Sequence, residues 1–269
     1  MQGVGTNEIL DYMTKQISSC RHILLIDPAN QSPDDAAKMA MIASEAGTSA
    51  IFVGGSTNTS DNIVHDTVIA IKEGLELVAF AASQNPSTED SEIIPIILFP
   101  NGSNALSPAA DAITFMMLMN SRQRRYLIEE QLTGSSFIND SEIEPLPTGY
   151  LVFSPGGKVG EVGDAELIEE GQEELVKSYS LTASMYGFKL LYLEAGSGAD
   201  RPISPQLVNA AKHENLTIIV GGGIRTPEQA KTAMEAGADW IVTGTIAEEA
   251  NNSEQLQNTL KMIIEAISN

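Results

Sequence analysis

Three short apolar runs in the C-terminal part of the chain each end in a glycine-rich turn, and this arrangement strongly constrains the fold. The runs cover residues 189–193, 217–220 and 240–242, and the turns contain Gly196 and Gly198, Gly221 to Gly223, and Gly244. A short apolar run that ends in a turn signal is typical of a buried strand. Helical patterns separate the runs, so we expect the three turns at the same end of one parallel sheet.

The glycine turns are suited to binding a phosphate group. Glycine has no Cβ, so backbone N–H groups can approach an anion closely and form a concave site around it. The loops that follow the last strands of a (β/α)8 barrel frequently form such a site. Three turns of this kind in succession therefore predict a phosphorylated ligand.

Strand-like and helical segments alternate along the chain, which predicts an α/β fold, a (β/α)8 TIM barrel. Five further strands are expected at residues 22–27, 50–53, 95–99, 112–116 and 149–153. Helices are expected at residues 33–46, 62–72, 172–186, 205–213, 227–236 and 253–267. The first helix has clear end signals, because Ser32 can cap it, Pro33 suits its first position and Gly47 suits its C-cap. Residues 75–82 could form an additional short strand before a polar inserted loop.

The composition predicts one barrel-sized domain that covers residues 1–269. The chain has 42% hydrophobic residues, and no linker or low-complexity segment divides it. Cys20 is the single cysteine, and no apolar run approaches the length of about 18 residues that a membrane span needs. The N-terminus also lacks the basic and apolar segments of a secretory signal. These features favour a cytoplasmic protein.

The formal net charge is −21, from 36 acidic and 15 basic residues. A surface of this charge disfavours nucleic acids and electrostatic docking on anionic lipids. An anionic ligand would therefore need a local group that binds it, either glycine amides or a divalent cation. Arg225, which follows the triple glycine, either contacts a phosphate or pairs with Asp239 or Glu248.

One connection in the predicted barrel differs from the others. Residues 100–108 are too few and too rich in turn-forming residues for a crossover helix. A barrel without its third helix would have an apolar groove in its wall. The apolar residues nearby are Ile113, Phe115, Met116, Met117, Leu118, Met119 and Tyr126. Core packing explains each of them singly, whereas together they could line a slot for a long hydrocarbon.

Polar side chains at the strand ends are the candidates for chemistry. Asp27 ends the first strand and Ser56 follows the second, and oxygen ligands of this kind suit Mg²⁺, which often bridges to substrate phosphates. Glu194 follows the strand at residues 189–193 and could orient or deprotonate a substrate hydroxyl. Tyr192 lies on the same face of that strand, where it either fills the barrel or contacts the substrate.

With these motifs the chain resembles the geranylgeranylglyceryl phosphate synthases of archaea and their bacterial heptaprenyl relatives. The matching segments are LLIDP at 24–28, AGTSAIFVGGST at 46–57, LFPNGS at 98–103, ADAITFMMLMNS at 110–121, PTGYLVFSPGGKVGEVGDA at 147–165, YLEAGSGADRP at 192–202, IVGGGIRTPEQA at 219–230 and AGADWIVTGTIAEE at 236–249. The segments YLEAGSG and GYLVFSPGG are selective for this family, whereas glycine turns occur in many phosphate-binding barrels.

The resemblance implies a barrel whose third helix is replaced by a non-helical segment. It also implies transfer of a geranylgeranyl group from its diphosphate to the 3-hydroxyl of sn-glycerol 1-phosphate, the first step of archaeal ether-lipid synthesis. The implied metal is Mg²⁺, held by Asp27 and Ser56. The implied glycerol 1-phosphate site consists of Tyr192, Leu193, Glu194, Ala195, Gly196, Ser197, Gly198, Gly222, Gly223, Gly244 and Thr245.

The same resemblance gives Glu194 and Tyr192 catalytic roles. Glu194 would hold the glycerol hydroxyl for attack and take its proton. The chain is further expected to form a homo-oligomer and to contact membranes at most peripherally, through its lipid product. It departs from the family at Asn30, where many members have a lysine, and at residues 75–92, which form an insertion.

Two other functions are compatible with the sequence. One is that of another phosphate-barrel isomerase or synthase, which acts on a small phosphorylated metabolite and needs no prenyl donor. The other is that of a barrel that binds a phosphate or a lipid without catalysis, and such a protein would bind glycerol phosphate without turnover.

Overall fold

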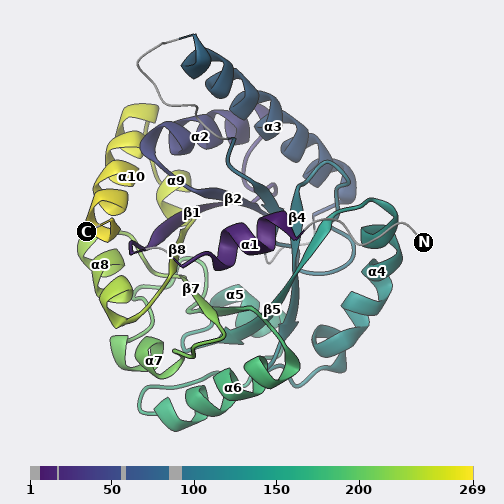
Figure 1. Cartoon of the computed structure of the whole chain (residues 1–269), viewed down its shortest axis with the longest axis vertical. Helices are drawn as coiled ribbons and strands as arrows, with labels where there is room; N and C mark the ends of the chain where they lie inside the picture. The colour runs from purple at the N-terminus through teal and green to yellow at the C-terminus, as the bar shows by residue number, and fades with distance from the viewer. Residues whose placement is uncertain (1–6, 17, 56–58, 85–92, 269) are drawn as a thin grey trace.

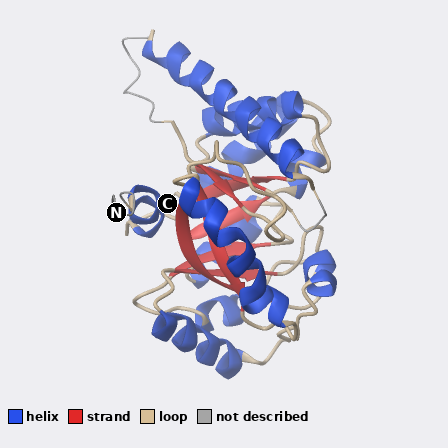
Figure 2. Ribbon diagram, turned by 90° about the vertical axis from the view of Figure 1, so that its right-hand side faces the viewer, coloured by secondary structure: helices blue, strands red, loops and turns tan. Residues whose placement is uncertain are grey.

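The computed structural model describes residues 7–16, 18–55, 59–84 and 93–268. Its centre is a closed barrel of eight parallel strands, in which β1 also pairs with β8. The strands are β1 (Arg21–Ile26), β2 (Ala50–Val53), β3 (Ile96–Leu98), β4 (Ala112–Leu118), β5 (Glu144–Val152), β6 (Leu190–Glu194), β7 (Thr217–Gly221) and β8 (Trp240–Thr243). The predicted (β/α)8 barrel is therefore confirmed (Figures 1 and 2).

Helices surround the barrel, as Figure 1 shows. They are α1 (Glu8–Thr14), α2 (Pro33–Ala46), α3 (Asp61–Ser83), the π-helical turn η1 (Arg125–Glu129), α4 (Glu130–Asp140), α5 (Gly157–Val162), α6 (Glu173–Tyr186), α7 (Pro205–Ala210), α8 (Pro227–Ala236), α9 (Thr245–Glu248) and α10 (Ser253–Ile267). The ends of α2 are as predicted: the Ser32 side chain accepts a hydrogen bond from the Asp35 N–H, and Gly47 adopts the left-handed conformation. No helix in the described part of the chain is long and apolar enough to cross a membrane.

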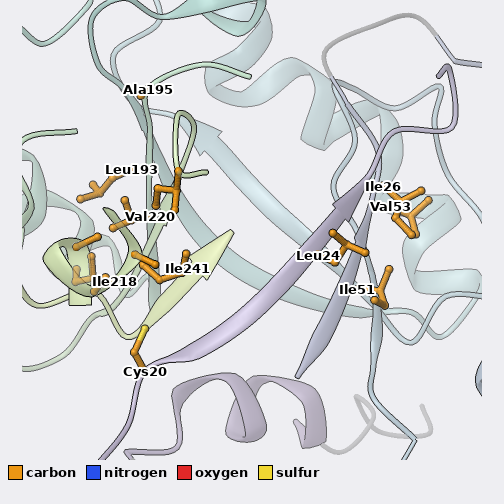
Figure 3. Close-up of a cluster of buried hydrophobic side chains, with 14 of the residues drawn as sticks. Cys20, Leu24, Ile26, Ile51, Val53, Leu193, Ala195, Ile218, Val220 and Ile241 are labelled. Atoms are coloured by element: carbon orange, nitrogen blue, oxygen red, sulfur yellow. The ribbon is translucent and has the colours of Figure 1, made fainter. Parts of the chain in front are cut away.

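The core has two layers because successive side chains of each strand point to opposite faces. The inner layer fills the barrel and includes Phe52, Tyr192 and Trp240, which are fully buried. The outer layer lies between the strands and the helices. Figure 3 shows part of it, with side chains of β1 and β2 on one side of the barrel and those of β6, β7 and β8 on the other.

Helix α1, which the sequence did not predict, closes the end of the barrel where the strands begin (Figure 1). Met13 of this helix is fully buried, and its carbonyl oxygen accepts a hydrogen bond of 2.9 Å from Nε1 of Trp240. The guanidinium carbon of Arg21 lies 3.8 Å from the centre of the Trp240 ring. These contacts leave the opposite end, where the strands finish, for a binding site.

The connection between β3 and β4 contains no helix, as predicted. The prediction of an extra strand at residues 75–82 was wrong, because α3 continues without a break to Ser83. Its buried side chains pack against α2 only as far as Leu75, and beyond that point Leu77 and Phe80 are 62% and 67% exposed. The apolar character of this stretch reflects an exposed helix surface rather than a buried strand. The remainder of the inserted loop, residues 85–92, lies outside the described residues.

Candidate active site

A pocket of about 380 Å³, open solvent included, lies among the turns that follow β6, β7 and β8. Of the predicted glycerol phosphate site, the residues that line this pocket are Tyr192, Glu194, Ser197, Gly222, Gly223, Gly244 and Thr245. We call it the glycine pocket. The three glycine turns, which lie far apart in the sequence, therefore converge as expected.

The other four residues of that set have different positions. Leu193 and Ala195 are fully buried in the outer core layer. Gly196 acts through its backbone, because its N–H donates a 2.6 Å hydrogen bond to Oε1 of Glu194. Gly198 adopts the left-handed conformation next to Ser197, at the edge of the turn.

Gly222 is the position at which the pocket most needs a glycine. Its φ of +84° is in the left-handed region, and a Cβ there would overlap Oε1 of Glu194. The same Cβ would come within 2.8 Å of the Gly196 nitrogen and within 2.9 Å of the Ala195 nitrogen. Backbone amides from two turns therefore approach each other beside the Glu194 carboxyl group.

Arg225 lines the same pocket, but it pairs with neither predicted partner. Its Nη1 donates a 2.5 Å hydrogen bond to the carbonyl oxygen of Ala199, and its Nε lies 3.9 Å from Oε2 of Glu249. Arg225 thereby links the turn after β7 to the turn after β6.

Glu194 is the titratable group at the centre of the site. Its side chain is buried, with 6% of the residue exposed. Burial raises the pKa of the carboxyl group to about 7, while the Gly196 N–H and the hydroxyl groups of Tyr192 and Tyr150 act in the opposite direction by favouring the charged form. A carboxyl group with a pKa near neutrality is suited to general base catalysis.

The hydroxyl of Tyr192 is buried and makes no hydrogen bond of ordinary geometry with a described residue, although it lies near the Glu194 carboxyl. A Cβ at Gly221 would overlap this hydroxyl. A buried donor that lacks a protein partner beside a pocket is available to a ligand. Tyr192 fills the barrel, which is one of the two alternatives from the sequence, and it also lines the pocket. Its contact with a substrate stays a prediction.

A second, larger and mainly apolar space of about 840 Å³, including open solvent, runs beside the helix-free connection between β3 and β4. We call it the groove. Of the residues predicted to line it, Ile113, Phe115, Met116, Leu118 and Tyr126 do so. Met119 instead packs outside the barrel, where its sulfur lies 2.9 Å from a Cβ built on Gly149, and Met117 is not among the lining residues. Gly134 and Ile138 of α4 form part of the wall, and the sequence did not indicate them.

Asp27 lies beside this groove but is not among its lining residues. Its carboxylate rests against the backbone of Gly55, so closely that a Cβ at Gly55 would overlap it, and Gly55 itself lines the groove. Oδ1 of Asp27 accepts a 2.9 Å hydrogen bond from the Ala29 N–H. Ser56, the second predicted metal ligand, lies outside the described residues. Asn30, at the family's lysine position, donates a 2.8 Å hydrogen bond to Oε1 of Glu248.

Three aromatic rings separate the groove from the glycine pocket. Phe99 and Tyr150 line the groove, whereas Tyr192 lines the pocket. The ring centres of Tyr150 and Tyr192 are 5.1 Å apart, as are those of Phe99 and Tyr192. The sequence did not single out Phe99 or Tyr150, since strand aromatics usually mean core packing.

The fold and these two spaces define the class of the protein: a (β/α)8 barrel with a glycine-lined pocket at the carboxyl ends of its strands and an apolar groove on the other side of an aromatic wall. Comparison with known proteins gives the family. The chain belongs to the PcrB family, whose model matches residues 15–267.

Two of its relatives are named geranylgeranylglyceryl phosphate synthase. The protein from Thermoplasma volcanium is 46% identical over 246 residues, which cover 91% of each chain. The protein from Methanosarcina mazei is 46% identical over 234 residues, which cover 86% of this chain and 87% of the relative. The resemblance noted in the sequence is thus confirmed.

Solved structures agree with this assignment. The wild-type GGGPS from Thermoplasma volcanium has a TM-score of 0.85 at 44% identity, with 97% of each chain covered. The (S)-3-O-geranylgeranylglyceryl phosphate synthase from Thermoplasma acidophilum, solved in complex with its substrate sn-glycerol-1-phosphate, has a TM-score of 0.85 at 38% identity, with 99% of each chain covered.

Proposed function

We propose that this protein is a prenyltransferase that joins geranylgeranyl diphosphate to the 3-hydroxyl of sn-glycerol 1-phosphate through an ether bond. The observation that carries the proposal is the position of the buried carboxyl group of Glu194, which lines the glycine pocket beside the aromatic wall that borders the groove. The Thermoplasma acidophilum relative with bound sn-glycerol-1-phosphate supports the acceptor substrate.

Glycerol 1-phosphate would bind in the glycine pocket with its phosphate on the backbone amides of the turns after β7 and β8. These turns supply Gly222, Gly223, Gly244 and Thr245. Hydrogen bonds from fixed amides make no use of cationic side chains, which explains how a chain of net charge −21 can hold an anion. The 3-hydroxyl would then lie towards Glu194 and Tyr192.

The prenyl tail would lie in the groove along β4 and α4. Full burial of about 20 carbons at roughly 0.8 kcal/mol each would exceed the free energy of a micromolar affinity about twofold. A groove that is open along part of its length is therefore sufficient for binding. The helix-free connection between β3 and β4 is what leaves this space unfilled.

Glu194 would act as the general base for ether formation. In this step the bond between C1 of the prenyl chain and the diphosphate oxygen breaks, and the glycerol 3-oxygen forms a bond to C1. The hydroxyl proton passes to the carboxylate of Glu194, whose pKa of about 7 keeps a large ionised fraction at neutral pH. The diphosphate leaves with the bonding electron pair, so charge and atoms balance.

Mg²⁺ fits the residues beside the groove. Asp27 offers carboxylate oxygens there, and the glycine turn against which it rests leads to Ser56, the second proposed ligand. No group of three His, Cys, Asp or Glu side chains in the described ranges could hold a metal. Mg²⁺ commonly binds through one or two carboxylates together with substrate phosphates. When bound here, the ion would neutralise the diphosphate and make it a better leaving group.

We further propose that the whole chain acts as one cytoplasmic domain that forms homo-oligomers and touches membranes only through its lipid product. The single, buried cysteine supports a reducing compartment. The outer face of α6 supports self-association, since Leu181, Met185 and Tyr186 are 47%, 76% and 66% exposed. Light scattering of the purified protein and of Met185→Glu tests the oligomer.

The test of function is incubation with both substrates and Mg²⁺, followed by analysis of the lipid product. We expect the prenyl glyceryl ether from the unmodified protein, and a loss of at least about a hundredfold in rate for Asp27→Asn and Glu194→Gln. Absence of the ether, or variants that keep the full rate, would refute the proposal. Turnover of a small phosphorylated metabolite without a prenyl donor would indicate the isomerase or synthase alternative.

A further inference from the structure

Tyr150 connects the two halves of the site, and the proposed chemistry does not yet use it. It lies in β5, directly beside Tyr192 of β6 in the register of the barrel. Its ring lines the groove, and only 5% of the residue is exposed. Glu194 follows Tyr192 by two residues and shares its face of β6, so the Tyr150 hydroxyl lies near the Glu194 carboxyl group, although the two form no hydrogen bond of ordinary geometry in this structure. Glu194 itself lines the glycine pocket on the other side of the aromatic wall.

We propose that Tyr150 is a positioning residue for ether formation: its hydroxyl donates a hydrogen bond to the Glu194 carboxylate and aims it at the acceptor hydroxyl. The proposal rests on the proposed function, because it assigns a role within that reaction. It places the contact with the base on the groove side, where the prenyl donor arrives.

The direction of this hydrogen bond follows from the surroundings of Tyr150. Burial, together with the nearby charge of Glu194, raises the pKa of the Tyr150 phenol well above its usual value. The phenol therefore stays protonated and can only donate to the ionised carboxylate. The Gly196 N–H donates to Oε1 of the same carboxyl group at 2.6 Å. Two donors, one from β5 and one from the turn after β6, would fix the orientation of the carboxylate better than one.

The neighbours of Glu194 leave few other groups for this task. The titratable side chains that face it are Tyr150 from β5 and Tyr192 from β6, as far as the structure describes the site. Arg225 is the charged side chain that lines the same pocket, but its contacts go to Ala199 and Glu249. The turn after β7 contributes only the backbone of Gly222 at this point.

A purely structural role for Tyr150 gives a different expectation. In that case the ring would fill the space between the groove and Tyr192, and the hydroxyl would be dispensable for the reaction. Tyr150→Phe separates the two roles because it keeps the ring and removes the hydroxyl. The rings of Phe99 and Tyr192 would keep their contacts with the ring at position 150.

The experiment measures kcat and KM for both substrates over about pH 5 to about pH 9. For Tyr150→Phe we expect kcat to fall about tenfold at neutral pH, with both KM values unchanged, since a hydrogen bond to a charged group is lost. We also expect the acid limb of the profile to move to higher pH. The lost hydrogen bond favours the ionised form of Glu194, so its removal raises the pKa of that group.

Tyr12→Phe is the matched control. The hydroxyl of Tyr12 donates a 2.8 Å hydrogen bond to the carbonyl oxygen of Ser49, at the end of the barrel that α1 closes. This variant loses a tyrosine hydrogen bond of similar kind far from the site. It is expected to lower the unfolding temperature slightly and to leave kcat and the pH profile unchanged.

A second variant reverses the sign of the effect. Site-specific replacement of Tyr150 by 3-fluorotyrosine makes the phenol more acidic and hence a stronger donor, so the acid limb should move to lower pH. A folded Tyr150→Phe protein with unchanged kcat and pH profile, or a fluorotyrosine protein whose profile does not move, overturns the inference. If the unmodified protein forms no ether at all, it is the proposed function that fails.

Discussion

Replacement of Glu194 by glutamine tests how deeply this carboxyl group is buried. The pKa of Glu194 rises from 4.5, the value for a solvated glutamate, to about 7 in the folded protein. Each unit of difference corresponds to about 1.4 kcal/mol, so the folded state loses about 3 kcal/mol when the group must ionise. Glutamine is close in shape and carries no charge, so Glu194→Gln avoids this cost.

The sign of the pH dependence follows from the raised pKa. Between pH 4.5 and about 7 the folded state binds the proton more tightly than the unfolded state, so the stabilising contribution of Glu194 is lost as the pH rises through that window. The free energies of unfolding of the variant and of the unmodified protein should therefore differ at about pH 4.5 only by an offset that does not depend on pH. Above about pH 7.5 the free energy of unfolding of the variant should exceed that of the unmodified protein by about 3 kcal/mol, although we expect its activity to be largely lost.

The assay is equilibrium unfolding in urea at a series of pH values. Glu228→Gln is the control, because Glu228 is exposed near the start of α8 and its pKa is lowered rather than raised. Its free energy of unfolding should show no gain over that of the unmodified protein as the pH rises, since a lowered pKa gives a pH dependence of the opposite sign. A difference for Glu194→Gln that is independent of pH would refute the reasoning, since it would mean that the Glu194 carboxyl is solvated.

Four further substitutions test the two spaces and the scaffold. Gly222→Ala should weaken glycerol phosphate binding at least about tenfold in calorimetry, because the new Cβ overlaps Oε1 of Glu194 at a φ of +84°. Gly187→Ala, at a φ of +83° with open space around it, should cost stability but leave binding intact. Gly134→Leu should weaken prenyl diphosphate binding and spare glycerol phosphate binding in the same assay, because it fills the groove. Thr226→Ala removes the capping box of α8, and should lower the free energy of unfolding by about 1 kcal/mol while activity is retained.

The limits of sequence reasoning are clearest at β4. The sequence grouped the apolar residues of β4 and its surroundings around one groove, and residues from both faces of β4 do line it: Ile113 and Phe115 pack in the outer layer, and Met116 and Leu118 in the inner layer. Met119 packs outside the barrel and does not line the groove. Side chains alternate between the two faces of a strand, so the pattern alone could not show which of them a groove in the wall would reach. Helix α4, which supplies Gly134 and Ile138, was missed because few of its residues are buried and its apolar pattern is weak.

The sequence by itself determined the alternation of strands and helices, the glycine turns after the last three strands, and the absence of a helix at residues 100–108. These features are readable because backbone preferences and burial periodicity are local. Only the tertiary structure decided that Glu194 is buried with a pKa near 7, and that Tyr150 and Tyr192 face it from adjacent strands. The electrostatics of such a group depends on which distant segments exclude water from it, and no local pattern records that.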